Sequence, residues 1–191
     1  MRKIILTEWV TLDGFVSDRK DIPSFVSSYF NDEMSMYEDV IVSSADTLML
    51  GRKTYESFAG SWPHVPGRPG VSEGEKEYAK KLNAMKKVVF SKTLDKVEWN
   101  NSQLYNEIDA EEIKKLKEQP GEDILIYGST SIVQALTNLG LLDEYQVLIH
   151  PILIGEGKPL FKNIKDTVKL KLVDSITHAT DVIRLTYQLE K

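Results

Sequence analysis

A glycine, two cations and a hydroxyl directly follow a short apolar segment, and this combination can bind a phosphate. Residues 48–50 are apolar, and Gly51, Arg52, Lys53 and Thr54 lead into a helix-compatible segment. A helix N-terminus presents unpaired backbone N–H groups that favour an anion. Gly51 allows close approach, Thr54 offers a donor, and an arginine can bind a phosphate in bidentate fashion. The alternative is a basic helix start on a solvated surface.

Two further apolar segments end in residues of the same kind. Ser91 and Lys92 follow one of them, and a glycine turn follows the other. The residues of that turn are Gly128, Ser129, Thr130 and Ser131. Alone, this turn is better explained as an ordinary helix cap. Ligands of open α/β sheets bind outside the carboxyl ends of the strands, so three such ends together predict a phosphate-binding site.

Two common nucleotide motifs do not fit. A phosphate-binding loop of the Gly-x-x-x-x-Gly-Lys-Thr type needs glycine at positions 47 and 52, which hold Thr47 and Arg52. The fingerprint Gly-x-Gly-x-x-Gly does not occur, and the nearest approach, at residues 155–157, lacks the third glycine.

Strands and helices alternate along most of the chain, and this order predicts an α/β fold. Beyond Gly140 the predicted strands follow one another without a helix, so we expect a mixed, mainly parallel sheet flanked by helices, with antiparallel C-terminal strands. Strands are predicted at residues 4–10, 47–50, 88–91, 124–127, 145–154, 168–176 and 182–189. Helices are predicted at about 27–44, 52–58, 74–83, 109–118 and from 128 onward. Residues 62–70 hold three prolines and two glycines and predict an irregular loop.

Composition bounds the class of protein. The 191 residues include 24 Lys plus Arg against 29 Asp plus Glu, a net charge of −5, which argues against nucleic-acid binding. There is no cysteine, which excludes disulfides and thiolate chemistry. No apolar run is long enough to span a membrane, and the N-terminal apolar run ends at Glu8 without a cleavage site. We therefore expect a single domain over residues 1–191, in the cytoplasm.

The segment Leu50 to Glu56 resembles the NADPH-binding turn of the dihydrofolate reductase-like superfamily, in the branch that includes the reductase domain of riboflavin biosynthesis. Residues 11–16 resemble the first active-site turn of that family, and residues 140–144 and 150–161 resemble its C-terminal signature. The resemblance implies the family's α/β fold, NADPH as cofactor, and a homodimer formed through the strands after Gly140.

The resemblance also assigns roles to residues. Gly51, Arg52, Lys53 and Thr54 would bind the pyrophosphate and the 2′-phosphate, and Ser91 and Lys92 the adenosine end. Gly128, Ser129, Thr130 and Ser131 would lie beneath the pyrophosphate and nicotinamide. Val16 and Tyr127 would line the nicotinamide pocket, or else belong to the core. Ser129 departs from the pattern, because the family commonly has a second glycine there.

Two carboxylates are candidates for the acid of such a reductase. Asp13 follows the first strand, next to the expected nicotinamide site, or else forms a turn with Gly14. Asp32 lies on the first helix, near the pterin-binding carboxylate of folate-reducing relatives, or else on a solvated helix face. Trp62 is the candidate to cover the substrate, or else belongs to the core.

The three histidines are not candidates for the chemistry. His64, His150 and His178 lie on unrelated segments, so no metal site is expected. We expect solvated positions for His64 and His178 and a structural one for His150.

The sequence therefore predicts an NADPH-dependent reductase of a small heterocyclic substrate, similar to 5-amino-6-(5-phosphoribosylamino)uracil reductase or to dihydrofolate reductase. The alternative is a catalytically silent NADP-binding module that acts through a partner. The zinc-binding deaminase that accompanies the riboflavin reductase is not present in this sequence. Without a confident pterin-binding carboxylate, the residues do not identify folate as the substrate.

Overall fold

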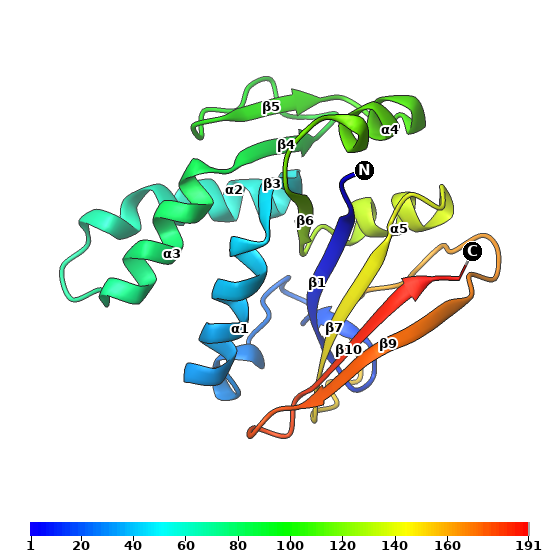
Figure 1. The fold of residues 1–191 in the computed structure, drawn as a ribbon. Helices are drawn as coiled ribbons and strands as arrows, with labels where there is room; N and C mark the ends of the chain where they lie inside the picture. The colour runs from blue at the N-terminus through cyan, green and yellow to red at the C-terminus, as the bar shows by residue number, and fades with distance from the viewer. Residues whose placement is uncertain (191) are drawn as a thin grey trace.

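A computed structural model describes residues 1–190. One eight-stranded sheet runs through it in the order β5-β4-β3-β6-β1-β7-β10-β9 (Figure 1). Neighbouring strands from β5 to β7 are parallel, whereas β10 is antiparallel to both β7 and β9. The strands are β1 (Ile4–Thr11), β3 (Ala45–Gly51), β4 (Lys86–Phe90), β5 (Ser102–Tyr105), β6 (Asp123–Tyr127), β7 (Glu144–His150), β9 (Leu170–Thr177) and β10 (Ile183–Leu189). The predicted mixed sheet with antiparallel C-terminal strands is confirmed.

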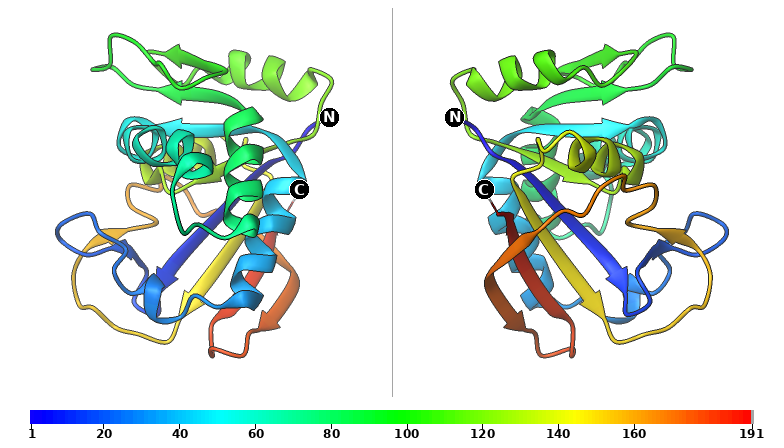
Figure 2. Two further views of the ribbon diagram at one scale, coloured as in Figure 1. Left: turned by 90° about the vertical axis from the view of Figure 1, so that its left-hand side faces the viewer. Right: turned by 90° about the vertical axis from the view of Figure 1, so that its right-hand side faces the viewer.

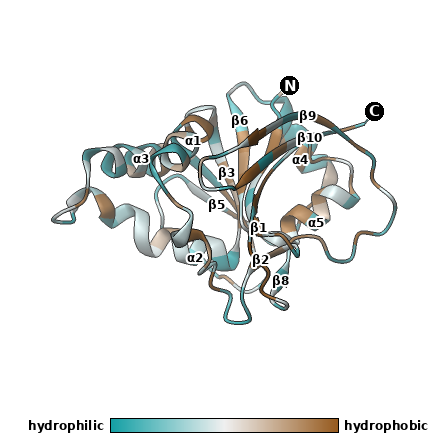
Figure 3. Cartoon of the chain, turned by 90° about the horizontal axis from the view of Figure 1, so that it is seen from below, coloured by the Kyte–Doolittle hydropathy of each residue, from teal (hydrophilic) through white to brown (hydrophobic). Residues whose placement is uncertain are grey.

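Helices cover both faces of this sheet. The helices are α1 (Asp32–Ser43), α2 (Arg52–Ser61), α3 (Glu73–Ala84), α4 (Ala110–Glu118) and α5 (Thr130–Asn138). Apolar residues of α1 and α3 pack with Leu48 and Leu125 on one face, and those of α4 and α5 pack with Met49 and Ile126 on the other. Figure 2 shows the same layers from two sides. In Figure 3 the central strands are coloured hydrophobic, whereas α3 is largely hydrophilic.

Two predicted segments differ in the structure. The helix expected at about 27–44 is divided into a 3₁₀ helix, η1 (Val26–Ser28), and α1. Asn31 breaks the run because its side chain accepts from the Met34 N–H and caps α1. The segment expected to be irregular contains a 3₁₀ helix, η2 (Trp62–Gly67), which tolerates Pro63 and Pro66 because short helices of this kind leave many N–H groups unpaired.

Three short strands have no counterpart in the sequence analysis. β5 has only four residues, two polar followed by two apolar, and this order gives no alternating strand pattern. β2 (Phe15–Ser17) and β8 (Lys158–Pro159) pair with each other to form a separate small antiparallel sheet. This pairing brings the segment after the first strand next to Lys158, a contact that local sequence does not encode.

An opening in the main sheet arises from unequal strand lengths. Pairing of β1 with β6 ends at Thr7↔Tyr127, whereas β1 continues alongside β7 as far as Thr11↔His150. The chain leaves β6 at Gly128 and turns into α5, so the second half of β1 faces this turn instead of a strand. In doubly wound sheets such a site is where ligands bind. Among the helices of residues 1–190, none is long and apolar enough to cross a membrane.

Candidate active-site cavity

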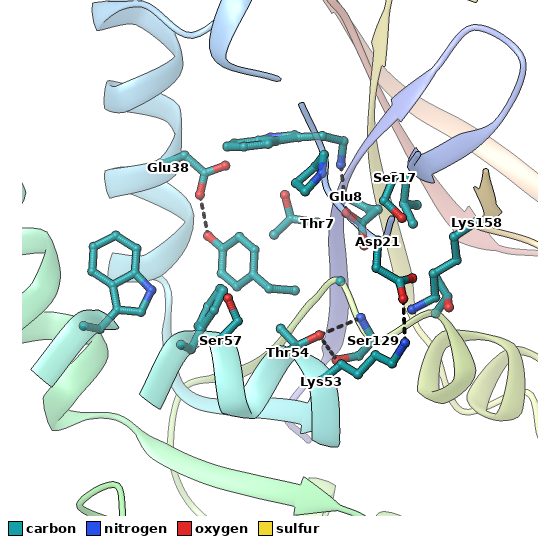
Figure 4. Close-up of a pocket in the computed structure, with 18 of the residues that line it drawn as sticks. Thr7, Glu8, Ser17, Asp21, Glu38, Lys53, Thr54, Ser57, Ser129 and Lys158 are labelled. Carbon is teal, nitrogen blue, oxygen red and sulfur yellow. Dashed lines mark hydrogen bonds and ion pairs between the residues drawn. The ribbon is translucent and has the colours of Figure 1, made fainter. Parts of the chain in front are cut away.

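A cavity of about 360 Å³ occupies this opening (Figure 4). Its walls come from β1, β2, α1, α2, η2, α3, the turn after β6, and β8. Predicted site residues that line it are Val16, Lys53, Thr54, Trp62, Tyr127, Gly128, Ser129 and Thr130. Other lining residues include Thr7, Glu8, Trp9, Ser17, Asp21, Glu38, Phe58, Tyr78 and Lys158. The sheet therefore collects segments from distant parts of the chain around one space.

Two helix N-termini, those of α2 and α5, meet at this cavity. Gly51 precedes α2 and Ser129 precedes α5, and neither helix has a side-chain cap at its N-terminus. An uncapped N-terminus leaves backbone N–H donors for an anion and places the positive end of the helix dipole there. With the Lys53 ammonium and the Thr130 hydroxyl nearby, this donor set fits a dinucleotide phosphate.

Ser129 connects the ends of β3 and β6. Its hydroxyl accepts from the Gly51 N–H at 2.9 Å and donates to Thr54 Oγ1 at 3.1 Å, and its own N–H donates to the same oxygen at 3.2 Å. Ser129 has φ 52°, a left-handed conformation that favours glycine, and it follows Gly128 at φ 56°. The departure from two glycines thus supplies a side chain that joins the two turns.

The cations at the start of α2 are both paired with carboxylates. Arg52 lies 3.1 Å from Glu56 one turn along the helix, and both side chains are exposed. Lys53 lies 2.5 Å from Asp21, which belongs to the loop between β2 and η1. Asp21 therefore lies across the cavity mouth, as Figure 4 shows, where an anionic ligand would compete with it for Lys53.

The remaining predicted cofactor residues lie at the same edge of the sheet but outside the cavity lining. Gly51 pairs with Phe90, so Ser91 and Lys92 follow at the adjacent strand end. The buried Ser91 hydroxyl accepts from the Thr93 and Leu94 N–H groups, which shapes the turn, while Lys92 is exposed. Ser131 is an exposed residue in the first turn of α5.

The side of the cavity formed by α1 and α3 contains a buried carboxyl that the sequence analysis missed. Glu38 Oε2 accepts from the Tyr127 hydroxyl at 2.7 Å and from the Tyr78 hydroxyl at 3.2 Å, while Oε1 is buried without a hydrogen-bond partner in residues 1–190. Burial raises the pKa of Glu38 to about 7, and it also raises the pKa of Tyr127 well above its usual value. Trp62 lies against Phe58 and Tyr78, which completes an aromatic wall around this carboxyl.

A second missed carboxyl lies on β1. Glu8 is at the position where β6 has ended, and its Oε2 is buried without a hydrogen-bond partner among the described residues. Burial raises the pKa of Glu8 to about 8. The Trp9 and Gly128 N–H groups and the Lys158 charge lower this pKa, but their effect is smaller than that of burial.

Both missed residues have a signal in the sequence. Glu8 is a charged residue inside a central strand of a parallel sheet, which is normally apolar. Glu38 falls on the apolar face of its helix, between Tyr37 and Ile41. A carboxyl at such a position is either paired in the core or functional.

The two predicted acids lie outside the cavity lining. Asp13 accepts from the Thr11 hydroxyl at 2.6 Å and from the Ile154 and Gly155 N–H groups at 3.1 and 2.7 Å. These hydrogen bonds, first that from Thr11, lower the pKa of Asp13. Asp32 is exposed in the first turn of α1, where its charge favours the helix dipole.

The histidines have mixed outcomes. His150 is buried among Phe25, Tyr29 and Trp9, as expected for a structural residue. The solvated position expected for His178 is wrong: its ring is buried, and Nδ1 lies 2.8 Å from Glu33 at the start of α1. His64 is exposed. Within residues 1–190, no group of three or more His, Asp or Glu side chains is placed to hold a metal ion.

The sheet order and the structural comparison define a dihydrofolate reductase-like fold. The chain belongs to the RibD C-terminal domain family, which matches residues 2–184. The uncharacterised protein YyaP of Bacillus subtilis (strain 168) is 36% identical over 186 residues, covering 97% of this chain and 94% of YyaP. The resemblance found in the sequence is therefore confirmed.

Solved structures show the same fold. A diaminohydroxyphosphoribosylaminopyrimidine deaminase/5-amino-6-(5-phosphoribosylamino)uracil reductase from Thermotoga maritima matches with a TM-score of 0.67 at 13% identity, covering 99% of this chain and 57% of that chain. Dihydrofolate reductase from Enterococcus faecalis, complexed with NADP(H), matches with a TM-score of 0.63 at 15% identity, covering 99% and 97%. At these identities the likeness concerns the fold.

Ser129 provides a test of the connection between β3 and β6. Ser129→Ala loses the hydroxyl but keeps the left-handed strain, so we expect its free energy of unfolding to be about 1–3 kcal/mol lower than that of the wild type. Ser129→Gly also loses the hydroxyl but relieves that strain, so its loss should be smaller. Urea unfolding measures both. Asn163, also left-handed at φ 59°, is the control: Asn163→Ala should cost less than Ser129→Ala. Equal costs at the two sites would exclude a stabilising role for the Ser129 hydroxyl.

Proposed function

We propose that this protein is an NADPH-dependent reductase of a small heterocyclic substrate. The observation that carries the proposal is one cavity with anion-binding helix N-termini on one side and buried carboxyl groups on the other. The family relationship supports a reductase, and the NADP(H) complex of the Enterococcus faecalis enzyme supports the cofactor.

The residues that would hold NADPH come from all three strand ends. The first turns of α2 and α5 would bind its diphosphate together with Thr54, Thr130 and Ser131. Arg52, Lys53, Ser91 and Lys92 would bind the 2′-phosphate and the adenosine end. Val16, Tyr127 and the turn formed by Gly51, Gly128 and Ser129 would surround the nicotinamide ribose and ring. When bound, this cofactor supplies a hydride.

The protein's part in the reaction is to orient the substrate and exclude water. Trp62, Phe58 and Tyr78 form an apolar wall on which a flat ring can stack. Glu38 Oε1, which is buried and has no partner within the described part of the chain, can accept a hydrogen bond from that ring. Neither group depends on a phosphate in the substrate, so a substrate other than the phosphoribosylated pyrimidine fits this proposal.

A catalytically silent NADP-binding module is the alternative function. Oxidation of NADPH, followed by its absorbance, separates the two functions when carbonyl, imine and pterin compounds are offered in turn. Turnover with any of them supports the reductase. Tight NADPH binding without oxidation by a broad panel would favour the silent module.

The protein should bind NADPH more tightly than NADH, because the cations at the adenosine end would contact the 2′-phosphate, which NADH lacks. A charge-assisted contact contributes about 1.5–3 kcal/mol, or tenfold and more in affinity. Arg52→Ala should reduce this preference while leaving the affinity for NADH nearly unchanged, as titration calorimetry can measure. Lys80→Ala, which removes an exposed cation on α3, is the control and should change neither affinity. Equal affinity of the wild type for both dinucleotides would contradict the prediction.

Asp13 and Asp32 remain proposals for the acid, and the structure offers a distinct experiment for Asp13. If Asp13 donates a proton, Asp13→Asn should keep NADPH binding and lose roughly 10²–10⁴-fold in turnover. If it holds the loop at Ile154 and Gly155, the variant should unfold at lower urea and keep turnover near that of the wild type. We expect the second result. Stable protein with greatly reduced turnover would show that this expectation is wrong.

We also propose a homodimer formed at the free edge of β9. Almost every residue of β9 is exposed, including Leu172 at 49%, Val173 at 45% and Ile176 at 38%. An edge strand offers unpaired backbone groups, and with exposed apolar side chains it favours pairing with another chain. A second copy presents the same surface and would satisfy both needs.

Sedimentation velocity tests the dimer. We expect dimers at micromolar concentration, and the double substitution Val173→Lys and Ile176→Lys should weaken association at least tenfold through like-charge repulsion and lost apolar contact. Lys171→Ala, on the same strand, is the control and should not weaken it. A wild-type monomer at these concentrations would exclude the dimer.

We also propose that residues 1–191 form a single domain and that the protein is located in the cytoplasm.

A further inference from the structure

Two carboxyls at the cavity, Glu8 and Glu38, each have one buried oxygen without a partner among the described residues. Glu38 Oε2 accepts from two tyrosine hydroxyls, whereas the other oxygen of Glu8, Oε1, accepts only from the N–H of its neighbour Trp9, at 3.2 Å. Asp21 pairs with Lys53. A buried polar atom without a partner is uncommon and calls for a physical explanation. The Glu8 side chain itself is only half-buried as a whole, because its remaining atoms line the cavity.

The position of Glu8 follows from the strand lengths. It is the first residue of β1 beyond the last pair with β6, so the turn at Gly128 lies beside it in place of a strand. Gly128 and Glu8 line the same cavity. Since Gly128 belongs to the turn proposed to hold the cofactor, Glu8 lies at the boundary between the cofactor and substrate parts of the cavity.

Charges of both signs lie near Glu8. Lys158 of β8 favours the carboxylate, Glu38 of α1 opposes it, and Asp21 and Lys53 of the cavity lining are paired with each other. Burial has the largest influence on the pKa of Glu8, and it favours the protonated form at neutral pH. A protonated carboxyl whose Oε2 has no acceptor on the protein can donate to a ligand.

We propose that Glu8 is the proton donor of the reductase. This role rests on the proposed function. A hydride from the bound cofactor forms the new C–H bond, the π electrons of the substrate C=N or C=O bond move to the heteroatom, and that atom takes the proton from Glu8. The carboxylate then regains a proton from water. An acid with a pKa close to the working pH suits this transfer.

The first test needs no substrate. The wild type should show an infrared C=O band of a protonated carboxylic acid that disappears as the pH rises through about 8. Glu38, with a pKa of about 7, contributes a band of the same kind that is lost at lower pH. Glu8→Gln should therefore lose only the component that disappears near pH 8, whereas Glu77→Gln, an exposed residue paired with Lys80, should keep it. If the pH dependence of the band is the same in Glu8→Gln as in the wild type, Glu8 is not the protonated group and the proposal is overturned.

Stability provides an independent readout with a definite sign. The folded-state pKa of Glu8 lies above its ordinary 4.5, so its contribution to stability is complete below pH 4.5 and is lost as the pH rises through about 8. Glutamine does not titrate. The urea midpoint of Glu8→Gln relative to the wild type should therefore rise with pH across this interval. A constant difference would contradict a protonated Glu8.

Kinetics test the donor role itself, with the compound that best supports NADPH oxidation. In the wild type kcat/KM should fall above pH 8. In Glu8→Gln, kcat/KM should be lower by roughly 10²–10⁴-fold and should no longer fall above pH 8. The affinity of this variant for NADP⁺ should be unchanged. Lys158→Gln should move the decline to higher pH, because it removes the cation that lowers the pKa of Glu8. Full turnover of Glu8→Gln would overturn the donor role and leave the reductase intact. Failure of the wild type to bind NADP⁺ would instead overturn the proposed function.

Discussion

The early end of β6 is the constraint on which the site depends. β6 stops at Tyr127, while its neighbour β1 continues for four more residues beside β7. Gly128 and Ser129 are both left-handed, so the chain cannot extend the strand and turns sharply into α5. This turn creates the opening, places the N-terminus of α5 beside that of α2, and leaves Glu8 facing a cavity where a strand would otherwise pair.

The same opening separates two kinds of chemistry. On the side of α2 and α5, helix dipoles, hydroxyls and Lys53 favour negative charge. Toward α1 and β1, Glu8 and Glu38 are buried, and their raised pKa values make them able to hold protons near neutral pH. A ligand that carries phosphates at one end and a reducible ring at the other would meet each environment with the matching part.

Local sequence predicts that the residues proposed to bind phosphate lie at neighbouring strand ends, because they form short contiguous motifs that directly follow the strands. The turn at Gly51 to Thr54 and the turn at Gly128 to Thr130 do meet at one cavity. The parallel strands and the C-terminal antiparallel pair were also predictable, from alternating and then uninterrupted strand patterns. The small sheet of β2 and β8 was not, since it joins segments about 140 residues apart.

Local sequence does not determine which carboxyls point into the cavity, because side-chain direction depends on register. Asp13 follows the first strand, but its carboxylate points to the Ile154 and Gly155 N–H groups and holds a loop. In the sequence, Glu8 looks only like the residue that ends the N-terminal apolar run. In the structure, β1 continues beyond it as a central strand of the sheet. A charge in the middle of such a strand costs several kcal/mol unless it is neutralised. Protonation removes most of that cost, and the stored proton is then available to a ligand in the cavity.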